Sequence, residues 1–241
     1  MRKLFSYFSR GEWILWLTSL SLILIAFVLF SGDGYLTLTA SLIGVTSLIF
    51  CAKGNPVGQA LMVIFSVLYG SISYSCAYYG EMLTYLGMTA PMALFSLIAW
   101  LVHPYKGNRS EVAVNRLRHR EIPLILLLTT IVTAGFYFVL DAFGTANMLP
   151  STISVATSFA AVYLTFRRCP YFALVYAAND LVLIVLWVLA AKTDISYLSV
   201  IICFSVFFVN DLYGFINWRR MERRQVTYAT EIKEPTECSS V

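Results

Sequence analysis

Two long apolar stretches in the C-terminal third of the chain each carry an Asn-Asp pair. Asn179-Asp180 lies in the first stretch and Asn210-Asp211 lies in the second, and most of their neighbours are Leu, Val, Ile, Phe and Ala. On insertion scales, an aspartate at the centre of a membrane helix costs about 2.5–3.5 kcal/mol. Ionisable residues in such a position are therefore interpreted first as part of a functional site, such as a substrate or ion pathway.

The residues after each pair place further polar and aromatic groups on roughly the same side of each predicted helix. Asn179 and Trp187 lie two turns apart on one face, and Asn210, Tyr213 and Asn217 form a similar stripe. Amides bond hydroxyl and carboxamide groups, and aromatic faces stack on flat rings or hold cations. The pattern favours a ligand with a sugar and a planar, cationic ring. The alternative is that these groups bond one another and hold the helices together.

The composition indicates an integral membrane protein. Of the 241 residues, 59% are hydrophobic and only 12% are charged, whereas soluble domains carry roughly 25% charged residues. The net charge of +4 therefore reports membrane orientation, and no nucleic-acid partner is expected. None of the five cysteines forms a C-x-x-C pair or lies near a histidine, so we expect no metal and no cofactor.

Eight stretches are apolar enough to cross a bilayer, which needs about 20 residues. Pro91 in the fourth stretch removes a backbone hydrogen bond and predicts a kink. Trp100 and Trp218 are expected to anchor the membrane edge, and Glu81 is expected to lie in a solvated outer turn. The predicted all-α spans cover residues 13–31, 35–52, 57–79, 82–102, 122–140, 148–166, 171–191 and 195–218.

The positive charges predict the orientation of these spans. If the N-terminus is cytoplasmic, 16 of the 17 lysines and arginines fall on the cytoplasmic side, and only Lys192 falls on the outer side. Cytoplasmic loops carry such an excess of Lys and Arg. Eight spans then place both termini in the cytoplasm.

The second to fourth and the sixth to eighth predicted spans look like copies of one three-helix unit. A basic residue is followed three positions later by a proline at Lys53 and Pro56, and again at Arg167 and Pro170, an offset of 114. Three helices end on the side opposite to their start, so the units run parallel only if one extra helix returns the chain. Parallel repeats of this kind are a transporter architecture. The predicted segments are 1–34 (N-terminal segment and extra helix), 35–102 (first repeat), 103–147 (basic linker and linking helix), 148–218 (second repeat) and 219–241 (disordered tail).

Five stretches in both halves of the predicted core carry a family resemblance. They are KGNPVGQ at 53–59, YYGEMLTYLGMTAPM at 78–92, STISVATSFAAVYLTFRR at 151–168, YAANDLVLIVLW at 176–187 and NDLYGFINW at 210–218. They resemble the PnuC family of bacterial vitamin-precursor transporters, especially its nicotinamide riboside members.

The resemblance implies a three-plus-one-plus-three fold like that of full-length SWEET transporters, with one extra N-terminal helix. It also implies a homotrimer in the bacterial inner membrane that imports nicotinamide riboside by facilitated diffusion, with a cytoplasmic kinase trapping the substrate. The family's Asn, Gln, Trp and Tyr side chains, together with the two aspartates that we add as counter-charges, give the predicted substrate-binding set. This set is Gln59, Asn179, Asp180, Trp187, Asn210, Asp211, Tyr213 and Asn217.

Other functions are weighed against this one. Thiamine and riboflavin are alternative substrates within the family. A membrane-embedded enzyme is disfavoured because no H-E-x-x-H, G-x-S-x-G or P-loop pattern occurs, and both histidines lie in the linker. A retinal photosensor needs a buried lysine, but Lys192 falls at an outer turn. Proton coupling through Asp180 or Asp211 stays open.

Overall fold

The computed structural model describes residues 7–30, 35–75, 79–145, 147–192 and 195–231. Within these ranges, eight helical segments are long and apolar enough to cross a membrane, as the sequence predicts. The helices are α2 (Arg10–Phe30), α3 (Tyr35–Ala52), α4 (Pro56–Ser75), α5 (Tyr79–Leu83), α6 (Ala90–Val102), α7 (Ile122–Ala142), α8 (Met148–Phe166), α9 (Phe172–Ala191) and α10 (Leu198–Glu231). The shorter elements are the π-helix η1 (Thr84–Thr89), the strands β1 (Pro104–Tyr105) and β2 (Asn108–Val112), and the 3-10 helices η2 (His119–Glu121) and η3 (Ile195–Tyr197).

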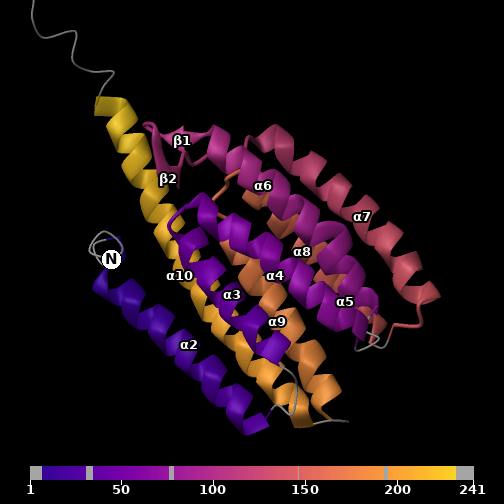
Figure 1. Ribbon diagram of the computed structural model, residues 1–241. Coiled ribbons are helices and arrows are strands. Elements are labelled where there is room, and N and C mark those ends of the chain that lie inside the picture. Colours follow the sequence, from indigo (N-terminus) through magenta and orange to yellow (C-terminus); the bar gives the residue numbers. More distant parts are fainter. Residues whose placement is uncertain (1–6, 31–34, 76–78, 146, 193–194, 232–241) are drawn as a thin grey trace, which may run out of the picture.

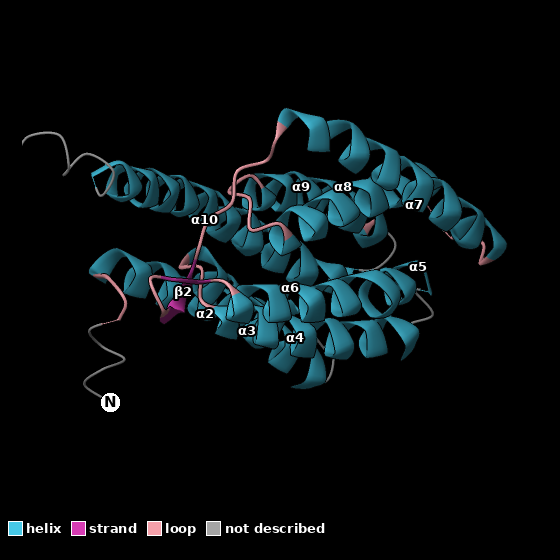
Figure 2. Ribbon diagram, turned by 90° about the horizontal axis from the view of Figure 1, so that it is seen from above, coloured by secondary structure: helices cyan, strands magenta, loops and turns pink. Residues whose placement is uncertain are grey.

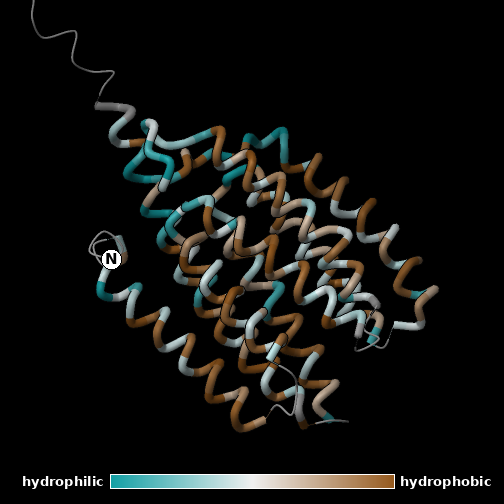
Figure 3. The backbone as a smooth tube through the Cα atoms, in the orientation of Figure 1, coloured by the Kyte–Doolittle hydropathy of each residue, from teal (hydrophilic) through white to brown (hydrophobic). Residues whose placement is uncertain are grey.

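The helices form a bundle with α2 and α7 at opposite edges (Figure 1). Inside it, α3 packs on α4 and α10, α4 packs on α6, and α9 packs on α8 and α10. The view from above shows α7, α8 and α9 on one side of the bundle and α3, α4 and α6 on the other (Figure 2). Hydrophilic residues gather where the β1–β2 hairpin and the C-terminal half of α10 lie (Figure 3). We call this end, which carries Lys53, the linker 103–121 and Arg219–Arg224, the basic end.

The linker is not the plain loop that the sequence predicts. Strands β1 and β2 pair antiparallel, so the mostly helical part of the chain that the structure describes includes a small hairpin at the basic end. The Val112 N–H donates to Gly54 O at 2.9 Å, and the Asn115 N–H donates to Arg168 O at 3.0 Å. The linker therefore lies across the turns after α3 and after α8, and it ties the two halves of the bundle together.

The tail prediction is wrong for residues 219–231, because α10 continues to Glu231; residues 232–241 lie outside the described ranges. Composition alone predicted disorder, but the linker supplies partners for this part of the helix. Arg116 Nε lies 2.8 Å from Glu222 Oε1, and the Gln225 side chain accepts the Val114 N–H at 2.8 Å. These contacts order residues that are too polar to be held by a membrane.

The turns after α3 and after α8 have the same hydrogen-bonding pattern at the predicted offset of 114. The Gly54 N–H bonds Cys51 O at 2.9 Å, and the Arg168 N–H bonds Thr165 O at 3.0 Å. Both turns also pass through the left-handed region, at φ +66° for Gly54 and +57° for Arg168. Glycine adopts this conformation freely, whereas Arg168 pays about 1–2 kcal/mol for it. The two turns therefore share one geometry, while the three-helix repeat itself stays a prediction.

Trp100 and Trp218 do not anchor the membrane edge; both are fully buried between the halves. Trp100 Nε1 donates to Thr165 O at 3.0 Å, and Trp218 Nε1 donates to Cys51 O at 2.8 Å. The two acceptors are again 114 positions apart, so the two contacts are reciprocal. The last carbonyl groups of a helix have no partner within the helix, and a buried indole N–H is well suited to satisfy them.

We expect Trp218→Phe and Trp100→Phe each to lower the free energy of unfolding by about 1 kcal/mol, the net value of a lost hydrogen bond. Equilibrium unfolding in mixed detergent micelles would measure both variants. An interface anchor would tolerate phenylalanine, so two variants as stable as the wild type would contradict the buried reciprocal contacts.

Candidate functional site

The two predicted aspartates meet in the middle of the bundle, between α9 and α10. Asp180 and Asp211 are both buried, and their carboxyl groups lie close enough to interact electrostatically. Like charges repel, so two buried carboxyl groups this close are costly to keep charged unless a proton or a cation accompanies them. Gln59 lies nearby. Its side-chain amide contacts Cys51 Sγ at 3.2 Å, and Cys51 is close enough to Asp211 for the two side chains to interact electrostatically.

Asn179 faces the other way, toward α8. Its Oδ1 accepts hydrogen bonds from Ser154 Oγ at 3.1 Å and from Thr157 Oγ1 at 2.8 Å. The hydroxyl partners were not predicted from the sequence. Because Ser154 also lines a cavity, Asn179 is one side chain away from that cavity.

A cavity of about 380 Å³, which we call the chamber, lies between α5, η1, α8 and α9. The residues that line it include Gly80, Phe143 and Asn147, which lie at the end of the bundle opposite to the basic end. Its volume falls within the range of small-molecule sites, about 300–1,000 Å³. The side chains that give the chamber its chemistry are Glu81, Tyr85, Ser151, Ser154, Ser158 and Trp187.

The three serines of the chamber form a stripe whose helical spacing is visible in the sequence. Ser151, Ser154 and Ser158 follow a spacing of three and four residues, which places them on one face of α8. Small hydroxyl side chains in a membrane helix commonly serve only in helix packing, so the sequence alone did not indicate that these serines belong to a site. Together with Trp187 on α9, they offer hydroxyl groups and an aromatic face to the same space.

The fourth span reaches the chamber through a local change of helix type. Residues Thr84–Thr89 are π-helical, directly before Pro91. Pro91 has no N–H, and the wider turn brings the Ala90 N–H to Tyr85 O, while Thr89 Oγ1 bonds Thr84 O at 3.2 Å. At the place where Pro91 predicts a kink, the structure thus has a π-helical segment. Such segments occur often at functional sites, and this one places Tyr85 in the chamber wall.

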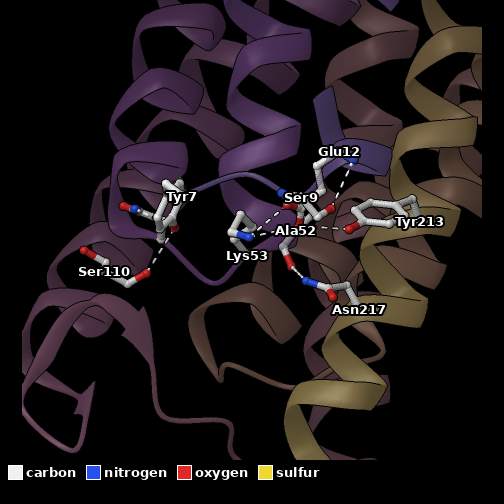
Figure 4. Close-up of polar contacts among 9 residues, drawn as sticks. Tyr7, Ser9, Glu12, Ala52, Lys53, Ser110, Tyr213 and Asn217 are labelled. Carbon is white, nitrogen blue, oxygen red and sulfur yellow. Dashed lines mark hydrogen bonds and ion pairs between the residues drawn. The ribbon is translucent and has the colours of Figure 1, made fainter. Parts of the chain in front are cut away.

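The three remaining predicted residues lie on α10 and turn toward α2 or α3, away from the chamber. Asn210 Nδ2 donates to Ser19 Oγ at 2.9 Å. Tyr213 donates to Glu12 Oε1 at 2.9 Å, and Asn217 Nδ2 donates to Ala52 O at 2.8 Å (Figure 4). In this conformation the three side chains hold helices together, and their contact with a substrate stays a prediction.

The basic end of the bundle is densely packed. Trp100, Trp218 and Phe172 contact one another, with the Trp100 and Trp218 ring centres 5.3 Å apart. Val112 of the linker is fully buried in the same cluster. Burial also raises the pKa of the Cys169 thiol in the turn after α8, so this cysteine is an uncharged packing group. The chamber is thus separated from the basic end by a layer of aromatic side chains.

A family model described as nicotinamide mononucleotide transporter matches residues 34–220, which is most of the chain. The chain belongs to this family. The matched range runs from the start of α3 to just beyond Trp218, so it contains the chamber, the aspartate pair and both tryptophans of the basic end. The protein is therefore a multi-pass membrane transporter, as its eight apolar helices indicate.

Two proteins that are similar to this chain are named nicotinamide riboside transporter PnuC. The one from Neisseria mucosa is 25% identical over 227 residues, which cover 92% of this chain and 86% of the relative. The one from Haemophilus influenzae is 23% identical over 193 residues, which cover 80% of this chain and 82% of the relative. A crystal structure of the vitamin B3 transporter PnuC matches with a TM-score of 0.78 and 24% identity, over 90% of this chain and 94% of that one, so the two chains share a fold.

Proposed function

We propose that this protein imports nicotinamide riboside across a bacterial inner membrane. The names of the two relatives supply the substrate class. The chamber is the observation that carries the proposal, because it combines serine hydroxyl groups for a ribose with Trp187 for a flat ring. The predicted site residue Asn179 supports the serine side of the chamber through Ser154.

The chamber favours the riboside over the phosphorylated mononucleotide that gives the family its name. A phosphate group needs Lys, Arg or clustered backbone N–H groups. Among the described residues that line the chamber, none is basic and Glu81 is acidic. The described ion-paired cations, which are Lys53, Arg116, Arg167, Arg219 and Arg224, all lie at the basic end. A phosphate in the chamber would therefore meet a like charge, whereas a pyridinium ring would meet an opposite one.

The remaining parts of the proposal concern orientation, energetics and assembly. The basic end is cytoplasmic by the distribution of Lys and Arg, so the chamber opens to the outside and both termini lie inside. Uptake proceeds by facilitated diffusion and becomes directional when a cytoplasmic kinase phosphorylates the riboside. The transporter is a homotrimer, as the family resemblance implies.

Uptake into proteoliposomes tests the substrate. We expect saturable uptake of nicotinamide riboside and little uptake of nicotinamide mononucleotide, thiamine or riboflavin. Trp187→Ala removes the aromatic face of the chamber and should reduce riboside uptake at low concentration about tenfold, the effect of losing about 1.4 kcal/mol of binding. Trp16→Ala on α2, which lies away from the chamber, is the matched control and should transport normally.

If the protein takes up thiamine or riboflavin in preference to nicotinamide riboside, the proposed substrate is wrong and the protein transports a different vitamin. Uptake of the mononucleotide at the same rate as the riboside would contradict the electrostatic argument. Facilitated diffusion also predicts exchange of labelled riboside across the membrane without any imposed proton gradient. If protons instead move inward together with the riboside, the transporter is proton-coupled and facilitated diffusion is contradicted.

A further inference from the structure

We propose that Glu81 makes the transporter selective for a positively charged ring, so that the chamber discriminates a pyridinium riboside from an uncharged riboside of the same shape. This inference rests on the proposed function and adds a residue that determines specificity. The sequence predicted Glu81 to lie in a solvated turn, but the structure places it in the wall of the chamber.

The carboxyl group of Glu81 is held in a defined position. Glu81 belongs to the first turn of α5, and the hydroxyl group of Tyr69 on α4 donates to its Oε2 at 3.0 Å. Tyr69 packs in turn against Tyr85, with ring centres 4.5 Å apart. The Tyr69 contact therefore holds the carboxyl group in a defined orientation at the chamber wall.

Glu81 has no cationic partner among the described residues. Four other glutamates whose side chains the structure describes, Glu12, Glu111, Glu121 and Glu222, each pair with Lys or Arg, and all lie toward the basic end. An acid that faces a membrane cavity without a counter-charge is costly to keep, and such residues mark substrate or ion pathways. A cationic ligand is the missing partner that would offset this cost.

The aromatic surroundings fit the same ligand. Trp187 and Tyr85 line the chamber together with Glu81. A flat cation is attracted by the faces of aromatic rings, and a nearby carboxylate adds a direct charge interaction. An uncharged ring can still stack on Trp187, but it gains nothing from Glu81. The chamber therefore provides a physical basis for distinguishing two rings that differ only in charge.

The competing explanation is structural. Glu81 lies in the first turn of a short helix and bonds Tyr69 between α4 and α5, so it can serve simply to join the two helices. That role would affect every substrate alike, because it acts through the shape of the chamber. The charge of the substrate is thus the variable that separates the two explanations.

The experiment compares nicotinamide riboside with its reduced 1,4-dihydro form in proteoliposomes. The reduced ring has the same sugar and carboxamide but no positive charge. We expect wild-type protein to take up the charged form with a KM about tenfold lower than that of the neutral form, which corresponds to about 1.4 kcal/mol. In Glu81→Gln, we expect the KM of the charged form to rise about tenfold and that of the neutral form to stay unchanged.

The glutamine variant is a sharp probe because its amide oxygen still accepts the Tyr69 hydroxyl hydrogen bond. Glu81→Asp keeps the charge and should keep most of the preference. Glu111→Gln removes a carboxylate at the basic end, where it pairs with Arg224, and is the matched control that should leave both KM values unchanged.

The outcomes separate this inference from the proposed function. Equal losses for the charged and neutral forms in Glu81→Gln would identify a structural role and overturn the inference, while riboside transport would stand. An unchanged preference in Glu81→Gln would overturn it as well. If wild-type protein takes up neither form, the proposed function fails and this inference fails with it.

Discussion

Glu12→Ala is expected to lower the free energy of unfolding by about 3–5 kcal/mol, because it leaves a largely buried ammonium group without its counter-charge. Glu12 is only 3% exposed. Lys53 Nζ lies 3.0 Å from its Oε1 and 2.9 Å from its Oε2, and Tyr213 donates to Oε1 at 2.9 Å (Figure 4). Equilibrium unfolding in mixed micelles would measure the loss.

The loss should follow from the broken pair and not from the missing side chain alone. The double variant Glu12→Gln/Lys53→Met removes both charges and should recover most of the stability, since a buried ion pair can often be replaced by neutral groups. Glu111→Ala breaks the more exposed pair with Arg224 and should cost no more than about 1 kcal/mol. A Glu12→Ala variant as stable as Glu111→Ala would show that the pair does not hold α2 in place.

The Glu12 cluster also explains which site predictions the sequence supported and which it left unresolved. Hydropathy located all eight spans, since a span must be long and apolar wherever it lies in the bundle. Helical spacing placed Asn210, Tyr213 and Asn217 on one side of α10, but spacing does not say what that side faces. In the structure it faces α2 and α3, whose own polar groups take up these side chains.

The start of α2 carries a local signal in the sequence. Ser9 and Glu12 have the S-x-x-E spacing of a capping box. The Ser9 N–H donates to Glu12 Oε2 at 2.6 Å, and the Glu12 N–H donates to Ser9 Oγ at 3.3 Å. The ion pair with Lys53 spans 41 positions and joins two helices, so no local pattern predicts it.

The chamber was less predictable than the aspartate pair for a similar reason. Asp180 and Asp211 stood out because charge is rare in apolar helices, and the structure does bring them together. Ser151 and Ser158 are chemically ordinary in a membrane helix, and they acquire a role only because Trp187 of another helix faces the same cavity. A site assembled from common residues on separate helices is a property of the packing, which single-sequence patterns do not contain.

Replacing both central aspartates, in Asp180→Asn/Asp211→Asn, is expected to separate stability from transport. Asparagine has nearly the shape of aspartate, and two amides can hydrogen-bond to each other without any charge. Removing a buried carboxyl pair from the centre of the membrane should therefore leave the free energy of unfolding unchanged or raise it by about 1–4 kcal/mol. Uptake of the charged riboside should nevertheless fall at least about tenfold, because the cation then crosses the bundle centre without a compensating negative charge.

The neutral dihydro-riboside supplies the control for this expectation. Its uptake should change little in the double variant, since it needs no counter-charge along the path. Equal loss of both forms would mean that the aspartates only hold α9 against α10, and normal uptake of the charged form would mean that they take no part in transport. A variant that is at least as stable as the wild type and impaired only toward the cation leaves function as the reason for keeping two costly acids at the centre of the bundle. It would also divide the recognition of charge between two places, with Glu81 acting at the chamber and the aspartate pair acting at the centre.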